Sequence, residues 1–161
     1  MIAEAIILAG GLGTRLKHIL PETPKPMAPV NGKPFLSYLI DYLHDWGISR
    51  IILSVGYKYQ DIHSHFTEKQ GDVDLIYSVE DEPQGTGGGI LKSLDHLTGD
   101  DVLVLNGDSM FRINMDLFEV FHRSKNSLLS IALRYQEETG RYGRVEMDDR
   151  QRITGFIEKG E

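Results

Sequence analysis

Hydrophobic residues along this chain alternate between short continuous runs and segments with the spacing of an amphipathic helix. A continuous apolar run is typical of a parallel strand that is covered on both faces. Four such runs predict buried strands: 4–9, 51–55, 73–79 and 102–105. The helical spacing between and after them predicts four helices: 35–46, 57–66, 90–97 and 115–124. This repeated alternation favours an α/β fold of three layers, Rossmann-like, with helices on both faces of a mostly parallel sheet.

Turn and cap signals refine these boundaries and extend the pattern to the end of the chain. Asn31-Gly32 predicts a turn, Pro34 opens the first helix and Gly47 ends it. In the helix over 115–124, the apolar positions are expected to pack inward. These positions are Leu117, Val120 and Phe121. Three further strands are predicted at 128–133, 142–147 and 152–157, the last two joined by a turn at 148–150.

Composition limits the classes of function. The 161 residues, 40% of them hydrophobic, suit one globular domain that covers the whole chain. The formal charge of −7 and the lack of a basic run disfavour nucleic acid or an anionic membrane as a partner. The absence of cysteine excludes disulfides and thiolate metal sites. The first residues resemble neither a secretory leader nor a membrane span, so a cytoplasmic location is expected. The sequence leaves open whether the chain forms a homo-oligomer.

Three glycines follow the first predicted strand. Gly10, Gly11 and Gly13 let the backbone approach a ligand closely, and their N–H groups suit an anion. The guanidinium of Arg15 adds a planar fork of donors for two phosphate oxygens. A polyphosphate is therefore the favoured ligand, although an ordinary strand-to-helix turn with a surface arginine is the alternative. Neither the dinucleotide fingerprint nor the P-loop pattern fits these residues, which argues against a nicotinamide dehydrogenase.

Lys25 lies between two prolines, Pro24 and Pro26. Proline fixes its own φ and restricts the residue before it, so this lysine is held more stiffly than most surface lysines. A compact ammonium on such a loop indicates a defined anionic target. Together with the glycine turn, it predicts a phosphate-binding site.

A second glycine-rich segment covers 80–89 and is predicted to be a loop that leads into the helix at 90–97. Free N–H groups and the positive end of the helix dipole would then point toward one place. The alternative is a flexible surface loop, because clusters of glycine often have no ligand.

Asp108 follows the strand at 102–105 in the segment Asn106-Gly107-Asp108. Open α/β sheets bind ligands beyond the carboxyl ends of their strands, and Mg²⁺ prefers one or two carboxylates plus substrate phosphates. The alternative is that Asp108 caps local N–H groups. The position of the residue leaves both roles open.

The glycine turn and the lysine loop together resemble a known family. GGLGTRL followed by PKPM is similar to the signature of the sugar-1-phosphate nucleotidyltransferases, which join a nucleoside triphosphate to a sugar 1-phosphate and release pyrophosphate. The resemblance implies a glycosyltransferase-A-like fold, Mg²⁺ as cofactor and metal binding by Asp108. It implies catalytic roles for Arg15, Lys25 and Asp108. The nucleotide-binding residues that it implies are Leu8, Gly10, Gly11, Gly13, Thr14, Gln84, Gly85 and Thr86.

Two late segments extend the resemblance. Arg141-Tyr142-Gly143 is similar to the family's YG segment and Glu158-Lys159 to its EK pair. This implies that Gly143, Glu158 and Lys159 bind the sugar phosphate; alone, both segments would be ordinary surface residues. Family members are longer and carry a second metal-binding aspartate further on. The domain over 1–161 is therefore expected to lack the C-terminal part of its relatives.

The resemblance as a whole implies transfer of a guanylyl group from GTP to D-glycero-D-manno-heptose 1-phosphate, for the synthesis of surface polysaccharide such as capsule. Mannose or glucose 1-phosphate as the acceptor is one alternative. A nucleotide-sugar-binding module without turnover is another, and the presence of Arg15, Lys25 and Asp108 together favours the enzyme. The EK pair favours a sugar phosphate over phosphocholine or molybdopterin as the acceptor.

Overall fold

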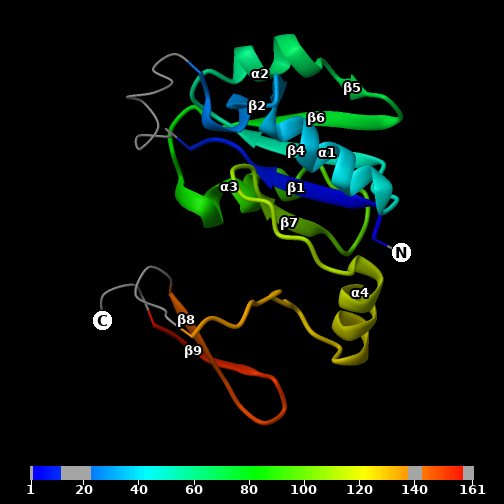
Figure 1. Ribbon diagram of the computed structural model, residues 1–161, viewed down its shortest axis with the longest axis vertical. Coiled ribbons are helices and arrows are strands. Elements are labelled where there is room, and N and C mark those ends of the chain that lie inside the picture. Colours follow the sequence, from blue (N-terminus) through cyan, green and yellow to red (C-terminus); the bar gives the residue numbers. More distant parts are fainter. Residues whose placement is uncertain (1, 12–22, 138–142, 158–161) are drawn as a thin grey trace. The chain divides into compact units, whose positions relative to one another are not determined.

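The computed structural model describes residues 2–11, 23–137 and 143–157, and it confirms the predicted α/β architecture (Figure 1). The chain divides into two compact units, Met1–Phe121 and His122–Glu161. The first unit contains a five-stranded sheet with the order β5-β6-β4-β1-β7. Its neighbouring strands are parallel except for β5 and β6, which pair antiparallel. The strands are β1 (Glu4–Leu8), β4 (Arg50–Val55), β5 (Lys69–Gln70), β6 (Val73–Val79) and β7 (Leu103–Asn106).

Helices cover both faces of this sheet, as the sequence pattern predicts. The helices α1 (Phe35–Asp45) and α2 (Tyr59–Phe66) pack on one face, where Ile7 of β1 joins a buried apolar core. Side chains alternate between the faces of a strand, so the buried Ile6 points to the other side. There α3 (Gly85–Leu94) packs against β1, β4 and β6. The sheet is thus the middle of three layers.

Short elements connect the first strand to the first helix. A 3₁₀ turn, η1 (Lys25–Met27), precedes the antiparallel pair β2 (Pro29–Val30) and β3 (Lys33–Pro34). The turn between these two strands has positive φ at Asn31 (49°) and Gly32 (78°), which confirms the predicted Asn-Gly turn.

The second unit contains an antiparallel pair of strands, β8 (Arg144–Met147) and β9 (Ile153–Ile157). Asp148 closes the connection between them, because its Oδ1 accepts the N–H groups of Arg150 (3.0 Å) and Arg152 (2.8 Å). Both strands and the turn are as predicted, within two residues at each described boundary. Among the described residues, no helix has the length and hydrophobicity needed to cross a lipid bilayer.

The predicted strand at 128–133 is wrong. These residues lie in irregular structure, and the side chains of Leu128 and Leu129 are fully or mostly exposed. A strand forms only where a neighbour satisfies its backbone N–H and C=O groups. The pairings of the described residues provide no such neighbour for 128–133.

The predicted loop at 80–89 is also wrong in its second half. α3 begins at Gly85, so all four glycines of the segment form its first turns instead of preceding it. Glycine disfavours helix formation in isolation, which is why the sequence pattern suggested a loop. Glycine is nevertheless required within this helix, because a Cβ at Gly89 would collide with Glu80 and Ser54.

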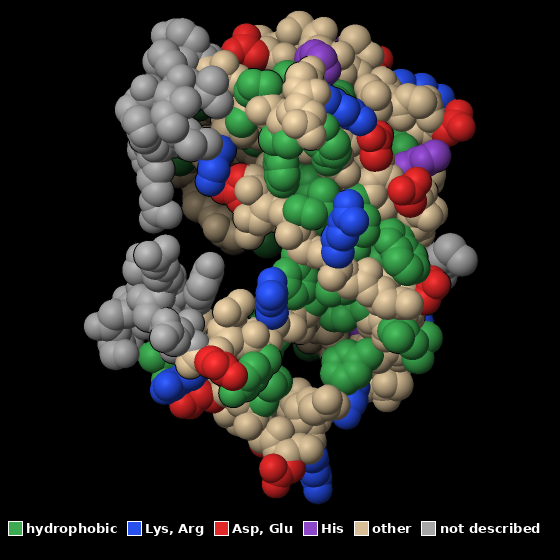
Figure 2. Space-filling view, viewed as in Figure 1, with side chains coloured by type: hydrophobic (Ala, Val, Ile, Leu, Met, Phe, Trp, Pro, Cys, Tyr) green, Lys and Arg blue, Asp and Glu red, His purple; other side chains and the backbone are tan. Residues whose placement is uncertain are grey.

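The inward face predicted for α4 (Met115–Ser124) is wrong for Leu117 and Val120, whereas Phe121 is half-buried. Leu117 and Val120 are 66% and 63% exposed, and hydrophobic side chains are visible at the surface near α4 in Figure 2. The helix instead turns Met115 and Phe118 toward Leu103 of the sheet. These two residues are three apart and therefore lie on one face of the helix, which competes with the face that carries Leu117.

A buried carboxylate fixes the amino end of β1. Glu4 is almost fully buried, and its oxygens accept the N–H groups of Thr98 (3.0 Å) and Gly99 (2.7 Å) and the hydroxyl of Thr98 (3.0 Å). The guanidinium of Arg50 lies 3.2 Å away. Burial raises the pKa of Glu4, but the backbone donors of Gly99 and Thr98, the Thr98 hydroxyl and the Arg50 charge together lower it below its usual value.

We expect Glu4→Gln to destabilise the fold by about 2 kcal/mol at pH 7, since it removes the charge and replaces one of the two acceptor oxygens by an amide donor. A depressed pKa in the folded state stabilises the fold at pH values above the ordinary glutamate pKa. This stabilisation is lost as the pH falls below about 4, so the difference between variant and parent should shrink there. Urea unfolding at pH 7 and pH 3.5 measures this, with the exposed Glu82→Gln as control. A difference that does not depend on pH would contradict the assigned role of the charge.

Candidate active site

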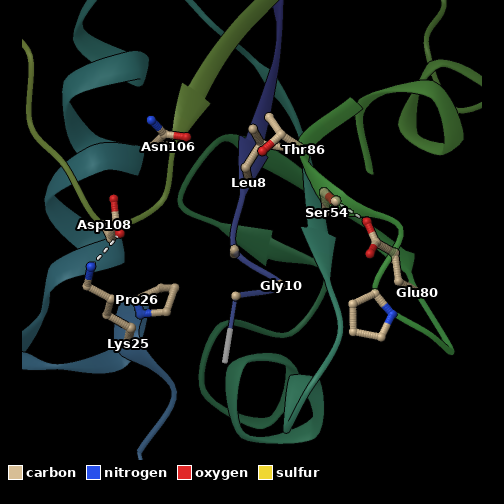
Figure 3. A pocket seen from close by; sticks show the side chains of 13 residues that line it. Leu8, Gly10, Lys25, Pro26, Ser54, Glu80, Thr86, Asn106 and Asp108 are labelled. Atoms are coloured by element: carbon tan, nitrogen blue, oxygen red, sulfur yellow. Dashed lines mark hydrogen bonds and ion pairs between the residues drawn. The ribbon is translucent and has the colours of Figure 1, made fainter. Parts of the chain in front are cut away.

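A cavity of about 550 Å³ lies at the carboxyl ends of the parallel strands (Figure 3). Each of the four parallel strands contributes to it within one residue of its end. Open α/β sheets bind their ligands at this edge. The residues that line the cavity are Leu8, Ala9, Gly10, Gly11, Lys25, Pro26, Ser54, Glu80, Pro83, Gly85, Thr86, Asn106 and Asp108.

The register of the sheet explains why residues far apart in sequence meet in this cavity. Leu8 pairs with Ser54 of β4 on one side and with Asn106 of β7 on the other, so these side chains form a row across the sheet. Backbone hydrogen bonds continue beyond the strands. The N–H of Glu80 donates to the carbonyl oxygen of Val55 (2.7 Å), which holds Glu80 at the edge of the sheet.

A close backbone approach places Asp108 beside the cavity. The N–H of Gly107 donates to the carbonyl oxygen of Leu8 (2.8 Å). A Cβ at Gly107 would lie only 2.8 Å from that same oxygen, so the turn after β7 requires glycine. The glycine thereby brings the following carboxylate against the end of β1.

The lysine loop delivers its ammonium to that carboxylate. Lys25 begins the turn η1, and the ring of the following Pro26 is buried, which anchors the loop. The N–H of Met27 donates to the carbonyl oxygen of Pro24 (2.8 Å). From this position Lys25 Nζ lies 2.5 Å from Asp108 Oδ2. The two residues are 83 positions apart in the sequence, and the fold makes them partners.

The pair keeps Asp108 ionised. The hydrogen bond from Lys25 lowers the pKa of Asp108, partial burial raises it, and the hydroxyl of Ser109, 2.8 Å from Oδ1, lowers it again. The net pKa lies below the usual value of an aspartic acid. At neutral pH the site therefore presents a carboxylate, which is the form that binds a divalent cation.

The structure brings together most of the predicted site residues that it describes. The cavity lining contains Leu8, Gly10, Gly11, Lys25, Gly85, Thr86 and Asp108. Gln84 does not line the cavity, but its N–H donates to Glu80 Oε2 (3.3 Å). Gly143 belongs to the second unit, directly before β8, and its sugar-phosphate role stays a prediction. The other predicted residues lie outside the described part of the chain: Gly13, Thr14, Arg15, Glu158 and Lys159.

Three polar residues of the lining were not predicted: Ser54, Glu80 and Asn106. Each lies within one residue of the carboxyl end of a parallel strand. Ser54 is a polar residue inside the otherwise apolar run Ile51 to Val55 and is nevertheless buried. A polar residue in such a place is the signal that could have indicated all three, since this edge of the sheet holds the ligand.

Comparison with known proteins identifies the family of this chain. The family model described as Nucleotidyl transferase matches residues 4–161. The chain belongs to the nucleotidyl transferase family. The cavity is accordingly the candidate active site of this nucleotidyl transferase, and the family is the one that the glycine turn and the lysine loop indicated.

Individual relatives of this nucleotidyl transferase support the family assignment. It is 43% identical, over 98% of its length and 68% of the relative's, to D-glycero-alpha-D-manno-heptose 1-phosphate guanylyltransferase of Aneurinibacillus thermoaerophilus. It is 33% identical to mannose-1-phosphate guanylyltransferase of Mycobacterium tuberculosis, over 98% of its length and 44% of the relative's. The crystal structure of HddC from Yersinia pseudotuberculosis complexed with GMP-PN superposes with a TM-score of 0.84 at 35% identity. That match covers 99% of this chain and 71% of HddC, and it confirms the predicted glycosyltransferase-A-like fold.

Proposed function

We propose that this protein transfers a guanylyl group from GTP to D-glycero-D-manno-heptose 1-phosphate and releases pyrophosphate. The meeting of the glycine turn, Lys25 and Asp108 in one cavity is the observation that carries this proposal. The similarity to a heptose 1-phosphate guanylyltransferase over 98% of the chain supports this donor and this acceptor. The product would serve the synthesis of surface polysaccharide, and the reaction would take place in the cytoplasm, where nucleoside triphosphates are available.

The residues around Asp108 fit Mg²⁺. Among the described residues, no group of three or more His, Cys, Asp or Glu side chains could enclose a metal ion. Mg²⁺ does not require such a cage, because it is commonly bound by one or two carboxylates together with substrate phosphates and water. Asp108 provides one ionised carboxylate, and the side chain of Asn106 in the same lining provides a further oxygen. When bound there, the metal would neutralise charge on the phosphates of the nucleotide.

The side chains and backbone of the site suit phosphoryl-type transfer. The acceptor phosphate is already an anion, so the reaction needs positioning and charge stabilisation more than a general base. The N–H groups of Gly10 and Gly11 would face the β and γ phosphates, and Arg15 would add its guanidinium. Lys25 would leave Asp108 to contact the α-phosphate, where negative charge accumulates as the sugar phosphate oxygen attacks and pyrophosphate departs. Lys159 would orient the incoming phosphate.

A substrate matrix tests this proposal on the chain of 161 residues. GTP, ATP, CTP and UTP are each combined with heptose, mannose and glucose 1-phosphates and Mg²⁺, and pyrophosphate release is measured. We expect release with GTP and the manno-configured heptose to exceed every other combination. A preference for glucose 1-phosphate would overturn the acceptor and leave nucleotidyl transfer. Tight GTP binding without pyrophosphate release from any combination would favour a binding module.

A further inference from the structure

Lys25 and Asp108, which have separate roles in the proposed reaction, bind each other in this structure (Figure 3). Asp108 Oδ2 lies 2.5 Å from Lys25 Nζ, and Asp108 Oδ1 accepts the hydroxyl of Ser109 (2.8 Å). Among the described residues, the ammonium of Lys25 has no acceptor other than Asp108. The carboxylate that would bind the metal is therefore the partner of the ammonium that would bind the α-phosphate.

This ion pair determines the charge that the cavity offers to a ligand. Lys25 is the one lysine or arginine among the described lining residues, whereas two carboxylates line the cavity, those of Glu80 and Asp108. While Lys25 contacts Asp108, their charges cancel and the charge of Glu80 is left over. A cavity wall of this charge disfavours a polyphosphate. Lys25 must therefore leave Asp108 before a triphosphate meets a cationic side chain of the described lining.

Asp108 is suited to one cation at a time. An ammonium and a divalent cation on the same carboxylate would be close neighbours, and the Coulomb repulsion between charges at such short separation is strong. The pair is also easy to open, because the side chains of Lys25 and Asp108 are 35% and 37% exposed. Ion pairs with this exposure contribute little free energy. Binding of a divalent cation to Asp108 should therefore displace Lys25.

The lysine loop allows this exchange without a change in the backbone. Pro26 is buried, and the N–H of Ala28 donates to the carbonyl oxygen of Lys25 (3.1 Å), so the turn η1 is anchored. The lysine side chain is flexible, and its ammonium can move while its Cα stays in place. The adjoining cavity of about 550 Å³ is also lined by Gly10 and Gly11, where the triphosphate is proposed to bind. A released ammonium thus has both space and a phosphate to move to.

We propose that the Lys25–Asp108 pair is an autoinhibitory latch, which opens when Asp108 binds a divalent cation and then releases Lys25 to the triphosphate. The latch rests on the proposed nucleotidyl transfer and adds regulation to the same site. Metal and triphosphate each favour the open arrangement, so each should raise the affinity for the other. Lys25 is thereby available to phosphate only when Asp108 has exchanged it for the metal.

Acetylation of lysines in the full chain, followed by mass spectrometry of the peptide that contains Lys25, tests the latch. Contact with a carboxylate covers the side-chain amine and slows its reaction with sulfosuccinimidyl acetate. We expect saturating Mg²⁺ without nucleotide to raise the acetylation rate of Lys25 about 5-fold, the factor by which an exposed pair shifts a population. GTP added with Mg²⁺ should lower the rate again, because the phosphates then cover Lys25. NaCl at the same ionic strength is the control for screening and should leave the rate nearly unchanged.

Matched variants open one ion pair at a time. Asp108→Asn removes the charge that holds Lys25, so Lys25 should be acetylated about 5-fold faster than in the parent chain, with or without Mg²⁺. Asp41→Asn makes the same change in the exposed pair of Lys33 with Asp41, neither of which lines the cavity. It should speed the acetylation of Lys33 and leave the Mg²⁺ response of Lys25 unchanged. Thermal unfolding midpoints verify that both variants remain folded.

Three results would overturn the latch, and they differ in what else they overturn. If Mg²⁺ leaves the acetylation rate of Lys25 unchanged while Mg²⁺ with GTP lowers it, the latch is wrong and the proposed transferase stands. A Mg²⁺ response of Lys25 that persists in Asp108→Asn would also exclude the latch, because the metal would then act from another place. Failure of GTP with Mg²⁺ to protect Lys25 would overturn the proposed function, in which Lys25 contacts the α-phosphate, together with the latch.

Discussion

The chain with Lys25→Ala is expected to release pyrophosphate from GTP and heptose 1-phosphate about 10²- to 10³-fold more slowly than the parent chain. The variant removes a preorganised ammonium that would meet the α-phosphate as charge accumulates there. The fold should survive, because the pair with Asp108 is partly exposed and such pairs contribute at most about 1 kcal/mol. Initial rates at saturating GTP and an unfolding midpoint measure the two effects separately.

The same variant distinguishes a catalytic lysine from one that only neutralises Asp108. Without Lys25, the carboxylate of Asp108 loses the cation that competes with the metal, so the Mg²⁺ concentration for half-maximal rate should not rise. Lys69→Ala is the matched control, since Lys69 pairs with Asp74 at 3.5 Å on an exposed part of the surface away from the cavity. Near-parental turnover in Lys25→Ala would remove this residue from the mechanism.

Asp108→Asn is expected to lower turnover by a similar factor, about 10²- to 10³-fold, for a different reason. The amide replaces the one carboxylate that would bind Mg²⁺, so the variant should need a much higher Mg²⁺ concentration for half-maximal rate. The rate, measured as a function of Mg²⁺ concentration at a fixed GTP concentration, reports this shift. The exposed Asp72→Asn, in the turn before β6, is the control for loss of an aspartate charge. An unchanged Mg²⁺ dependence in Asp108→Asn would mean that Asp108 only pairs with Lys25 and does not bind the metal.

The central sheet could be predicted from the sequence because its strands are buried on both faces. The runs from Glu4 to Leu8 and from Ile51 to Val55 each contain a single polar residue, and the local pattern alone indicates their structure. Pro34 and Gly47 set the ends of α1 for equally local reasons. Such features depend on neighbours in sequence, which the pattern contains.

The errors arose where structure depends on distant partners. Residues 128–133 have the composition of a strand but no neighbour to pair with among the described residues. α4 offers two apolar stripes, and the packing of Phe118 near Leu103 decides between them. α3 contains a glycine at position 89 because the helix passes too close to Glu80 for a side chain there. Local propensity gave the wrong answer in each case because tertiary structure, through a contact made or a partner strand lacking among the described residues, decides the outcome.

The candidate site also combines features that a single stretch of sequence indicates with features that depend on distant residues. The glycine turn and the proline-flanked lysine are recognisable in a single stretch of sequence. That Lys25 would lie 2.5 Å from Asp108 depends on the order of β1 and β7 in the sheet, and no spacing along the chain contains this information. Ser54 and Glu80 were missed because their neighbourhood depends on the pairing of β4 with β6. The resemblance to a family, rather than the spacing, linked the lysine and the aspartate in advance.

A crystal structure of the chain with Mg²⁺ and a non-hydrolysable GTP analogue would show where the triphosphate and the metal bind. We expect the triphosphate to lie against the backbone of Gly10 and Gly11, with Lys25 turned from Asp108 to the α-phosphate and the metal on Asp108. A nucleotide bound outside this cavity, or bound inside it with its phosphates away from both Lys25 and Asp108, would contradict the account.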